Sequence, residues 1–227
     1  VPLYYAAVGD RYRTLERIGA GGMAEIYRVE HLDLGKQFAL KIIAPELALR
    51  EKIRDLFYRE ARIMSQLDHP NIVAVTDFGV DPKHGAFIVM ELLQGEALRT
   101  RLTREGGLAN NLVVNLAIQI AEGLDYLHRS NLLHCDIKSE NVFLCQPPPR
   151  QPGRITVKLI DFGLSRSRAA SGQHPSGAIR GTPHYLAPEL IRGAPSTPSM
   201  DIYAFGVLLY EMATGECPFE GELDAVV

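Results

Sequence analysis

The first third of the chain consists mostly of short runs of apolar residues separated by polar or turn-forming residues, a pattern typical of β-strands. Five such runs are rich in β-branched and aromatic residues and are separated by Gly or Asp-Pro: 12–18, 25–30, 37–43, 72–78 and 86–90. One segment, 54–67, instead repeats apolar residues at helical spacing, namely Leu56, Ala61, Ile63, Met64 and Leu67. The pattern therefore predicts a small sheet with one long helix up to about residue 90.

After Glu91 the spacing of apolar residues becomes mainly helical. A core-facing helix is predicted over 112–128, where apolar residues recur at three- and four-residue steps. A second helix is predicted over 202–214, because Gly215 follows it as a stop signal. The later part of the chain is therefore expected to be mostly α-helical.

Less regular segments separate these two helices. Short strands are predicted at 142–144 and 157–160, with a Pro-rich insertion at 146–153 between them. A long irregular stretch follows over 164–188. A β-rich part followed by an α-rich part predicts two lobes, with a ligand-binding cleft near their junction at 90–95.

Composition narrows the functional classes. The chain has 227 residues, 46% of them hydrophobic, and a formal net charge of −3, which argues against a broad nucleic-acid-binding surface. Its three cysteines form no Cys-x-x-Cys pair, so a reducing compartment is expected rather than a disulfide framework. No signal peptide and no apolar run of about 20 residues is present, so we expect a cytoplasmic chain without a membrane segment, although a parent protein could carry an anchor outside it.

A glycine-rich run, GAGGMA at 19–24, lies between two predicted strands. The run also fits the dinucleotide-binding fingerprint, but that interpretation requires a helix directly after it, and the following EIYRV at 25–29 favours a strand. Backbone N–H groups of a glycine-rich hairpin can approach phosphate oxygens, because no Cβ atoms intervene. An ordinary hairpin turn explains the run equally well.

Lys41 ends the apolar strand 37–43, and Glu60 lies 19 residues later in the predicted helix 54–67. A Lys–Glu pair joining a strand to a helix could hold a cation against phosphate groups. The alternative is a lysine that is simply an edge charge.

Three later motifs carry a stronger signal. The run HCDIKSEN at 134–141 places an acid, a base and an amide in one loop; DFG follows at 161–163 and GTPHYLAPE at 181–189. With these motifs the chain resembles the protein kinase family, and the runs GGMAEIY, GTPHYLAPE and DIYAFGVLLYEMATG are similar to bacterial eukaryotic-like (Hanks-type) serine/threonine kinases. The resemblance covers residues from about Asp10 to Phe219.

The resemblance implies an α+β, bilobal fold and a division of the chain into three parts. These are an N-terminal extension at 1–9, a β-rich N-lobe with one long helix at 10–90, and a mainly helical C-lobe at 91–227. Members of the family continue through further C-lobe helices, so the C-lobe is expected to be incomplete and to lack its last helices.

The resemblance also implies an activity and its residues. The chain is expected to transfer the γ-phosphoryl group of ATP to protein Ser/Thr hydroxyls in signal transduction. Asp136 would accept or orient the hydroxyl proton, Lys138 would stabilise the transferring group, and Lys41, oriented by Glu60, would contact the α- and β-phosphates. Asn141 and Asp161 would hold Mg²⁺, with Mn²⁺ as an alternative.

The remaining implied residues surround the nucleotide and the substrate. Thr182 would position the substrate, and it favours serine/threonine over tyrosine specificity together with Lys138. The nucleotide would be bound by a flap and an adenine pocket made of Ile18, Gly19, Gly21, Gly22, Ile26, Ala39, Lys41, Met90, Glu91, Leu93 and Phe143. Protein substrates and self-association for autophosphorylation are the expected partners.

Three positions depart from the family pattern. Cys135 replaces the arginine that precedes the catalytic aspartate and grips an activation-loop phosphate, so strict dependence on phosphorylation is not expected. Ala24 replaces the last flap glycine, and Ser139 replaces the usual proline of the catalytic loop, which removes a fixed φ. The Ala24 and Ser139 replacements are expected to change the rate without abolishing activity. The competing hypothesis is a kinase-shaped binding or scaffold protein that is inactive because it lacks the last C-lobe helices, whereas a nicotinamide-dependent oxidoreductase is opposed by every motif after residue 24.

Overall fold

The computed structural model describes residues 7–20, 24–43, 58, 61–146, 155–161, 166–167 and 183–219. The chain forms two compact units. The first unit comprises Val1–Asp68 and Val73–Leu93, and the second comprises His69–Ile72 and Gln94–Val227. Predictions that fall on the other residues lie outside the described residues. Within the predicted helix 54–67, the structure describes residue 58 and residues 61–67, of which 58 and 61–64 are helical.

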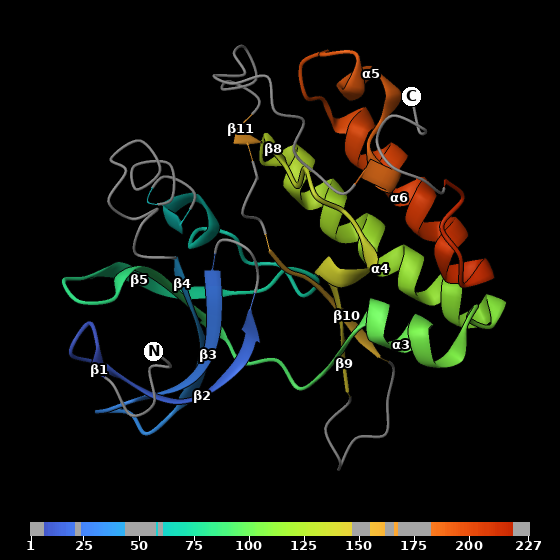
Figure 1. The fold of residues 1–227 in the computed structure, drawn as a ribbon. Coiled ribbons are helices and arrows are strands. Elements are labelled where there is room, and N and C mark those ends of the chain that lie inside the picture. Colours follow the sequence, from blue (N-terminus) through green and yellow to red (C-terminus); the bar gives the residue numbers. More distant parts are fainter. Residues whose placement is uncertain are drawn as a thin grey trace. The chain divides into compact units, whose positions relative to one another are not determined.

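The first unit is built on a six-stranded antiparallel sheet (Figure 1). Its strand order is β1-β2-β3-β4-β6-β5, so that chain neighbours pair except where β6 lies between β4 and β5. The strands are β1 (Ala7–Val8), β2 (Tyr12–Ala20), β3 (Ala24–His31), β4 (Gln37–Ile43), β5 (Val75–Asp81) and β6 (Gly85–Glu91).

The strand that follows the glycine-rich run separates two interpretations of it. β3 begins at Ala24 and pairs with β2 as an antiparallel hairpin. The helix that dinucleotide binding requires at this place is therefore replaced by a strand, and that interpretation is wrong.

One predicted strand begins later than its apolar pattern indicated. The run 72–78 predicted a strand from Ile72, but β5 starts at Val75. Ile72 belongs to the second unit and instead forms a parallel bridge there with Leu159, because β-branched residues favour extended pairing without specifying the partner.

The core of the first unit lies on one face of its sheet. Alternate residues of β4 point to the same side, and Phe38, Leu40 and Ile42 are all buried there. They join an apolar cluster with Val8, Tyr12, Tyr27, Val29, Phe87 and Val89. This face of the sheet therefore carries the apolar core of the first unit.

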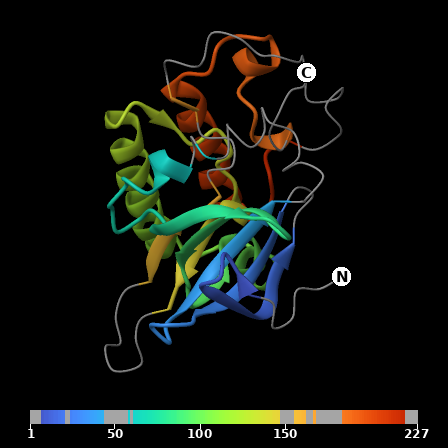
Figure 2. The ribbon, with the colours of Figure 1, turned by 90° about the vertical axis from the view of Figure 1, so that its left-hand side faces the viewer.

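The second unit is mainly helical, as Figures 1 and 2 show. Its helices are α3 (Leu98–Glu105), α4 (Asn110–Arg129), α5 (Pro188–Ile191) and α6 (Pro198–Thr214), with 3₁₀ turns η1 (Ser139–Asn141) and η3 (Pro183–Tyr185). A three-stranded sheet in the order β10-β9-β7 and a β11-β8 pair complete it. These strands are β7 (Gly95–Ala97), β8 (Leu132–Leu133), β9 (Val142–Cys145), β10 (Thr156–Leu159) and β11 (Arg166–Ser167).

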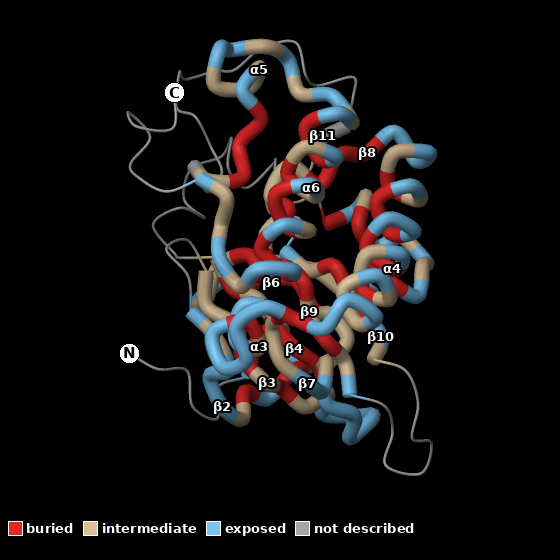
Figure 3. The backbone as a smooth tube through the Cα atoms, turned by 90° about the vertical axis from the view of Figure 1, so that its right-hand side faces the viewer, coloured by how far each residue is buried: buried red, intermediate tan, exposed pale blue. Residues whose placement is uncertain are grey.

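The two long helices match their sequence patterns. α4 buries the apolar stripe that predicted it, including Leu116, Ile120, Leu124 and Leu127. α6 begins four residues before the predicted start, at Pro198, because proline is well suited to the first turn of a helix. Figure 3 shows buried backbone on both helices. No helix in the described part of the chain is long and apolar enough to cross a membrane.

Candidate active site

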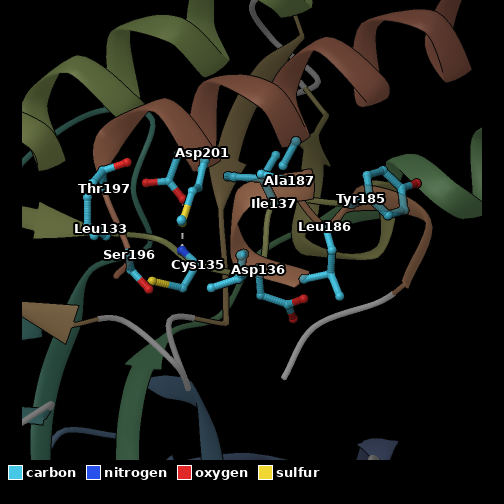
Figure 4. A pocket seen from close by; sticks show the side chains of 13 residues that line it. Leu133, Cys135, Asp136, Ile137, Tyr185, Leu186, Ala187, Ser196, Thr197 and Asp201 are labelled. Carbon is cyan, nitrogen blue, oxygen red and sulfur yellow. Dashed lines mark hydrogen bonds between the residues drawn. The ribbon is translucent and has the colours of Figure 1, made fainter. Parts of the chain in front are cut away.

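The loop that carries HCDIKSEN runs from β8 to β9 and is fixed at its start by Asp201 of α6. Asp201 Oδ2 accepts a hydrogen bond of 3.0 Å from the His134 backbone N–H, and Oδ1 accepts one of 2.9 Å from the Cys135 N–H (Figure 4). His128 Nε2 lies 2.8 Å from the same Oδ2. Burial alone would raise the pKa of Asp201, but these hydrogen bonds lower it below its usual range.

Cys135 adopts a left-handed backbone conformation within this loop. Its φ is 65°, a region that non-glycine residues occupy uncommonly. The hydrogen bond from its N–H to Asp201 holds the conformation, so that the anchoring carboxylate offsets local backbone strain. The thiol lines a hollow together with Asp136, Leu186, Thr197 and other residues of the second unit (Figure 4).

Three of the predicted catalytic-loop residues come together around one carboxylate. Lys138 Nζ lies 2.9 Å from Asp136 Oδ2. Asn141 Nδ2 donates to the same Oδ2 at 2.8 Å and to the Asp136 backbone carbonyl at 2.8 Å. The Asp136 side chain is 15% exposed, so the group stays accessible while two neighbours fix its orientation.

His134 supports Asp136 from inside the fold. It is fully buried, and its Nδ1 accepts a hydrogen bond of 3.3 Å from the Asp136 N–H. Burial lowers the pKa of His134 despite the carboxylates of Asp201, Asp136 and Asp161 nearby. A neutral imidazole is therefore the form that the loop requires, because Nδ1 must accept rather than donate.

The donor set suits a divalent cation. Asn141 turns its amide nitrogen toward Asp136, so its Oδ1 points away from that carboxylate and can act as a ligand. Asp161 is exposed and has a φ of 61°. Within the described residues, no group of three or more His, Cys, Asp or Glu side chains converges as a metal site. An amide oxygen and a carboxylate are hard ligands that leave other positions on the metal for phosphate oxygens and water.

A second buried carboxylate lies at the other end of the loop. Glu211 of α6 is fully buried and is contacted by Ser139, Tyr185 and Arg99. Burial and the hydrogen bond to Glu211 raise the pKa of Tyr185, and the hydrogen bond to Glu211 raises the pKa of Arg99. One signal for this site is visible in the sequence, because Glu211 interrupts the apolar run of α6. Nothing local indicated Arg99 as its partner.

The sheet register of the first unit places four predicted nucleotide-binding residues on one face. Ile26 pairs with Lys41, and Ala39 pairs with Met90, so each pair shares a side. Ala39 and Lys41 are two residues apart in β4 and therefore share that side too. This face lies opposite the one that carries Phe38, Leu40 and Ile42.

The other predicted residues are distributed as follows. Gly19 pairs with Ile26, and Ile18, 46% exposed, lies where the β2–β3 register shifts. Glu91 ends β6 and its Oε1 accepts the Ala74 N–H at 2.8 Å. Leu93 is half-buried at the end of the first unit, and Phe143 is half-buried in β9 of the second. Outside the described residues lie Gly21, Gly22, Glu60 and Thr182.

Comparison with known proteins identifies the class of protein to which this fold and site belong. Residues 12–226 match the family model described as "Protein kinase domain". The chain belongs to the protein kinase family, and the α+β, bilobal kinase fold predicted from the sequence is confirmed. Protein kinases in general use ATP and a divalent metal and act on protein substrates.

Several bacterial kinases are similar along nearly the whole chain. Serine/threonine-protein kinase pkn2 of Myxococcus xanthus is 38% identical over 216 residues, which are 94% of this chain and 25% of that protein. PrkC of Bacillus subtilis is 34% identical over 215 residues, 95% of this chain and 32% of PrkC. PknL of Mycobacterium tuberculosis is 37% identical over 221 residues, 97% and 53% respectively. The chain therefore spans between a quarter and about half the length of these relatives.

Proposed function

We propose that this domain transfers the γ-phosphoryl group of ATP to serine or threonine hydroxyls of proteins. The observation that carries the proposal is the arrangement of Asp136, Lys138 and Asn141 around one carboxylate oxygen, on a loop anchored by Asp201. The names of the relatives support serine/threonine rather than other acceptors.

Each catalytic-loop residue has a chemical task in this proposal. Lys138 and Asn141 both engage Oδ2 of Asp136, so we assign Oδ1 to the acceptor hydroxyl, whose proton it orients or accepts. Lys138 carries a positive charge next to Oδ2 of Asp136 and stabilises negative charge on the transferring group. The protein forms no covalent intermediate in this proposal, so the positioning of the reacting groups supplies most of the rate enhancement of phosphoryl transfer.

We assign the metal site to Asn141 and Asp161, with Mg²⁺ as the ion and Mn²⁺ as a substitute. A bound divalent cation would supply charge neutralisation for the phosphates. The orientation of the Asn141 amide supports this assignment, because its two hydrogen bonds to Asp136 commit the nitrogen and leave the oxygen as the ligand atom.

The proposed nucleotide-binding residues comprise those for the phosphates and those for the adenine base. Lys41, oriented by Glu60, contacts the α- and β-phosphates, and Gly19, Gly21 and Gly22 form the flap over them. The shared sheet face of Ile26, Ala39, Lys41 and Met90 supports this, because an apolar surface next to one lysine suits a base joined to phosphates. Other members of the adenine pocket are Ile18, Glu91, Leu93 and Phe143.

The remaining assignments concern substrate and setting. Thr182 positions the substrate, and autophosphorylation takes place through self-association. We propose a cytoplasmic location and a role in signal transduction, with protein substrates that present a Ser or Thr acceptor.

The test is transfer of labelled phosphate from Mg-ATP to the chain itself and to a generic basic acceptor protein. Asp136→Asn keeps the size of the side chain but removes the carboxylate, so we expect transfer to fall at least about 100-fold. Transfer that persists in this variant would contradict the role of Asp136. Absence of transfer in the unmodified chain, with Mg-ATP still raising its Tm, would support the scaffold hypothesis instead.

A further inference from the structure

Three side chains from different elements converge on the fully buried carboxylate of Glu211. Arg99 Nη1 of α3 lies 2.9 Å from Oε1, and Ser139 Oγ of η1 donates to the same oxygen at 3.0 Å. The Tyr185 hydroxyl of η3 donates to Oε2. Burying a carboxylate without such partners would lower the stability of the fold, so folding requires these contacts with Glu211.

Ser139 is the member of this group that belongs to the catalytic loop. It lies three residues after Asp136 and two before Asn141, and its side chain is fully buried. Its Oγ is also 3.4 Å from the Tyr185 hydroxyl. Because this hydroxyl is buried, water cannot replace its hydrogen bond to Glu211 when the hydroxyl is removed by substitution.

Ser139 and the predicted metal ligand Asn141 belong to the same short turn, so the position of one constrains the position of the other. Ser139 opens the 3₁₀ turn η1, which ends at Asn141 and is closed by a 3.0 Å hydrogen bond from the Asn141 N–H to the Lys138 carbonyl. Asn141 in turn orients Asp136 through its amide nitrogen. Kinases usually have a proline at this position, where the ring fixes φ; here φ lacks that covalent restraint.

We propose that Ser139 is a positioning residue for phosphoryl transfer, and that its hydrogen bond to Glu211 replaces the restraint of the missing proline. The inference rests on the proposed function for its kinetic consequence. Its structural part, that Ser139 attaches η1 to α6, stands on the contacts of Glu211 alone.

The experiment compares Ser139→Ala with Ser130→Ala in the full chain. Ser130 is the control, because it is exposed and its hydroxyl donates at 2.9 Å to the Tyr126 carbonyl of α4. For Ser139→Ala we expect kcat to fall about 10-fold or more while the KM for ATP changes less than about twofold, because geometry rather than binding is lost. Amide hydrogen exchange at residues 138–142 should become faster than in Ser130→Ala.

Two results would overturn the proposal. One is a kcat of Ser139→Ala equal to that of Ser130→Ala. The other is faster exchange throughout α4 and α6 as well as in the loop, which would make the serine a general packing residue. If the unmodified chain transfers no phosphate, the proposed function fails, whereas the exchange measurement still decides whether Ser139 holds η1.

Discussion

Gly95 begins β7 in a backbone conformation that other residues rarely adopt. Its φ is 151°, and a Cβ placed there would lie 2.0 Å from the Leu144 carbonyl oxygen of β9. We therefore expect Gly95→Ala to lower the free energy of unfolding by at least about 2 kcal/mol, because strain and overlap with backbone act together. Urea unfolding of the variant measures this loss.

Gly193→Ala is the matched control for that prediction. Gly193 also has a positive φ, 82°, but nothing lies within 4 Å of its added Cβ. Its substitution should cost only the conformational term, about 1 kcal/mol. Equal losses in the two variants would show that close approach of β7 and β9 does not constrain residue 95.

At the scale of elements, Gln119 of α4 joins three segments that are distant in sequence. Its Oε1 accepts the Val157 N–H of β10 at 2.9 Å and Asn71 Nδ2 at 3.1 Å, and its Nε2 donates to the Ile155 carbonyl at 2.9 Å. Asn71 Nδ2 also donates to the Val157 carbonyl at 2.9 Å. The segment 69–72 is held in the second unit by this amide network.

Replacing Gln119 by Leu should destabilise the second unit by about 1–3 kcal/mol, because the buried Val157 N–H of β10 and the Ile155 carbonyl lose their partner. Urea unfolding again measures the change, and Ile118→Ala is the control. Ile118 lies on the same helix and is 48% exposed, so its substitution should change stability by no more than about 0.5 kcal/mol. If both variants are equally stable, the amide network contributes nothing.

At the scale of the whole molecule, each unit contains a buried aspartate that remains ionised in the folded state. Asp81 accepts N–H groups of Gly9, Lys83 and His84 in the first unit, and these hydrogen bonds outweigh burial and lower its pKa. Asp201 has a lowered pKa in the second unit for the corresponding reason. Both carboxylates therefore contribute to stability above the pKa of the unfolded state.

We expect this contribution to be lost as the pH falls below about 3.9, because the unfolded chain then takes up protons that the folded chain does not bind. Tm measured from pH 7 to pH 3 should fall in this window, and less steeply in Asp81→Asn. Asp33→Asn, an exposed aspartate of the same unit, is the control. A profile of Asp81→Asn parallel to that of the unmodified chain would contradict the prediction.

The sequence by itself determined those features that depend on residues close together in the chain. Short runs of β-branched and aromatic residues predicted five of the six strands of the first sheet, although one of them was predicted to begin too early, and the apolar stripes predicted α4 and α6. The run 134–141 predicted Asp136, Lys138 and Asn141 as one group, because a loop of eight residues confines its own side chains. The family followed from the order of the motifs.

Only the tertiary structure decided which distant residues meet. Ile72 pairs with Leu159 and not with the strand predicted for it, and Arg99 contacts Glu211, which lies 112 positions away in the chain. Neither contact has a local signature, because an apolar residue or a charge does not specify its partner. The physical reason is burial. Glu211 is fully buried, so water cannot hydrogen-bond to its carboxylate, and donors from α3, η1 and η3 take that place.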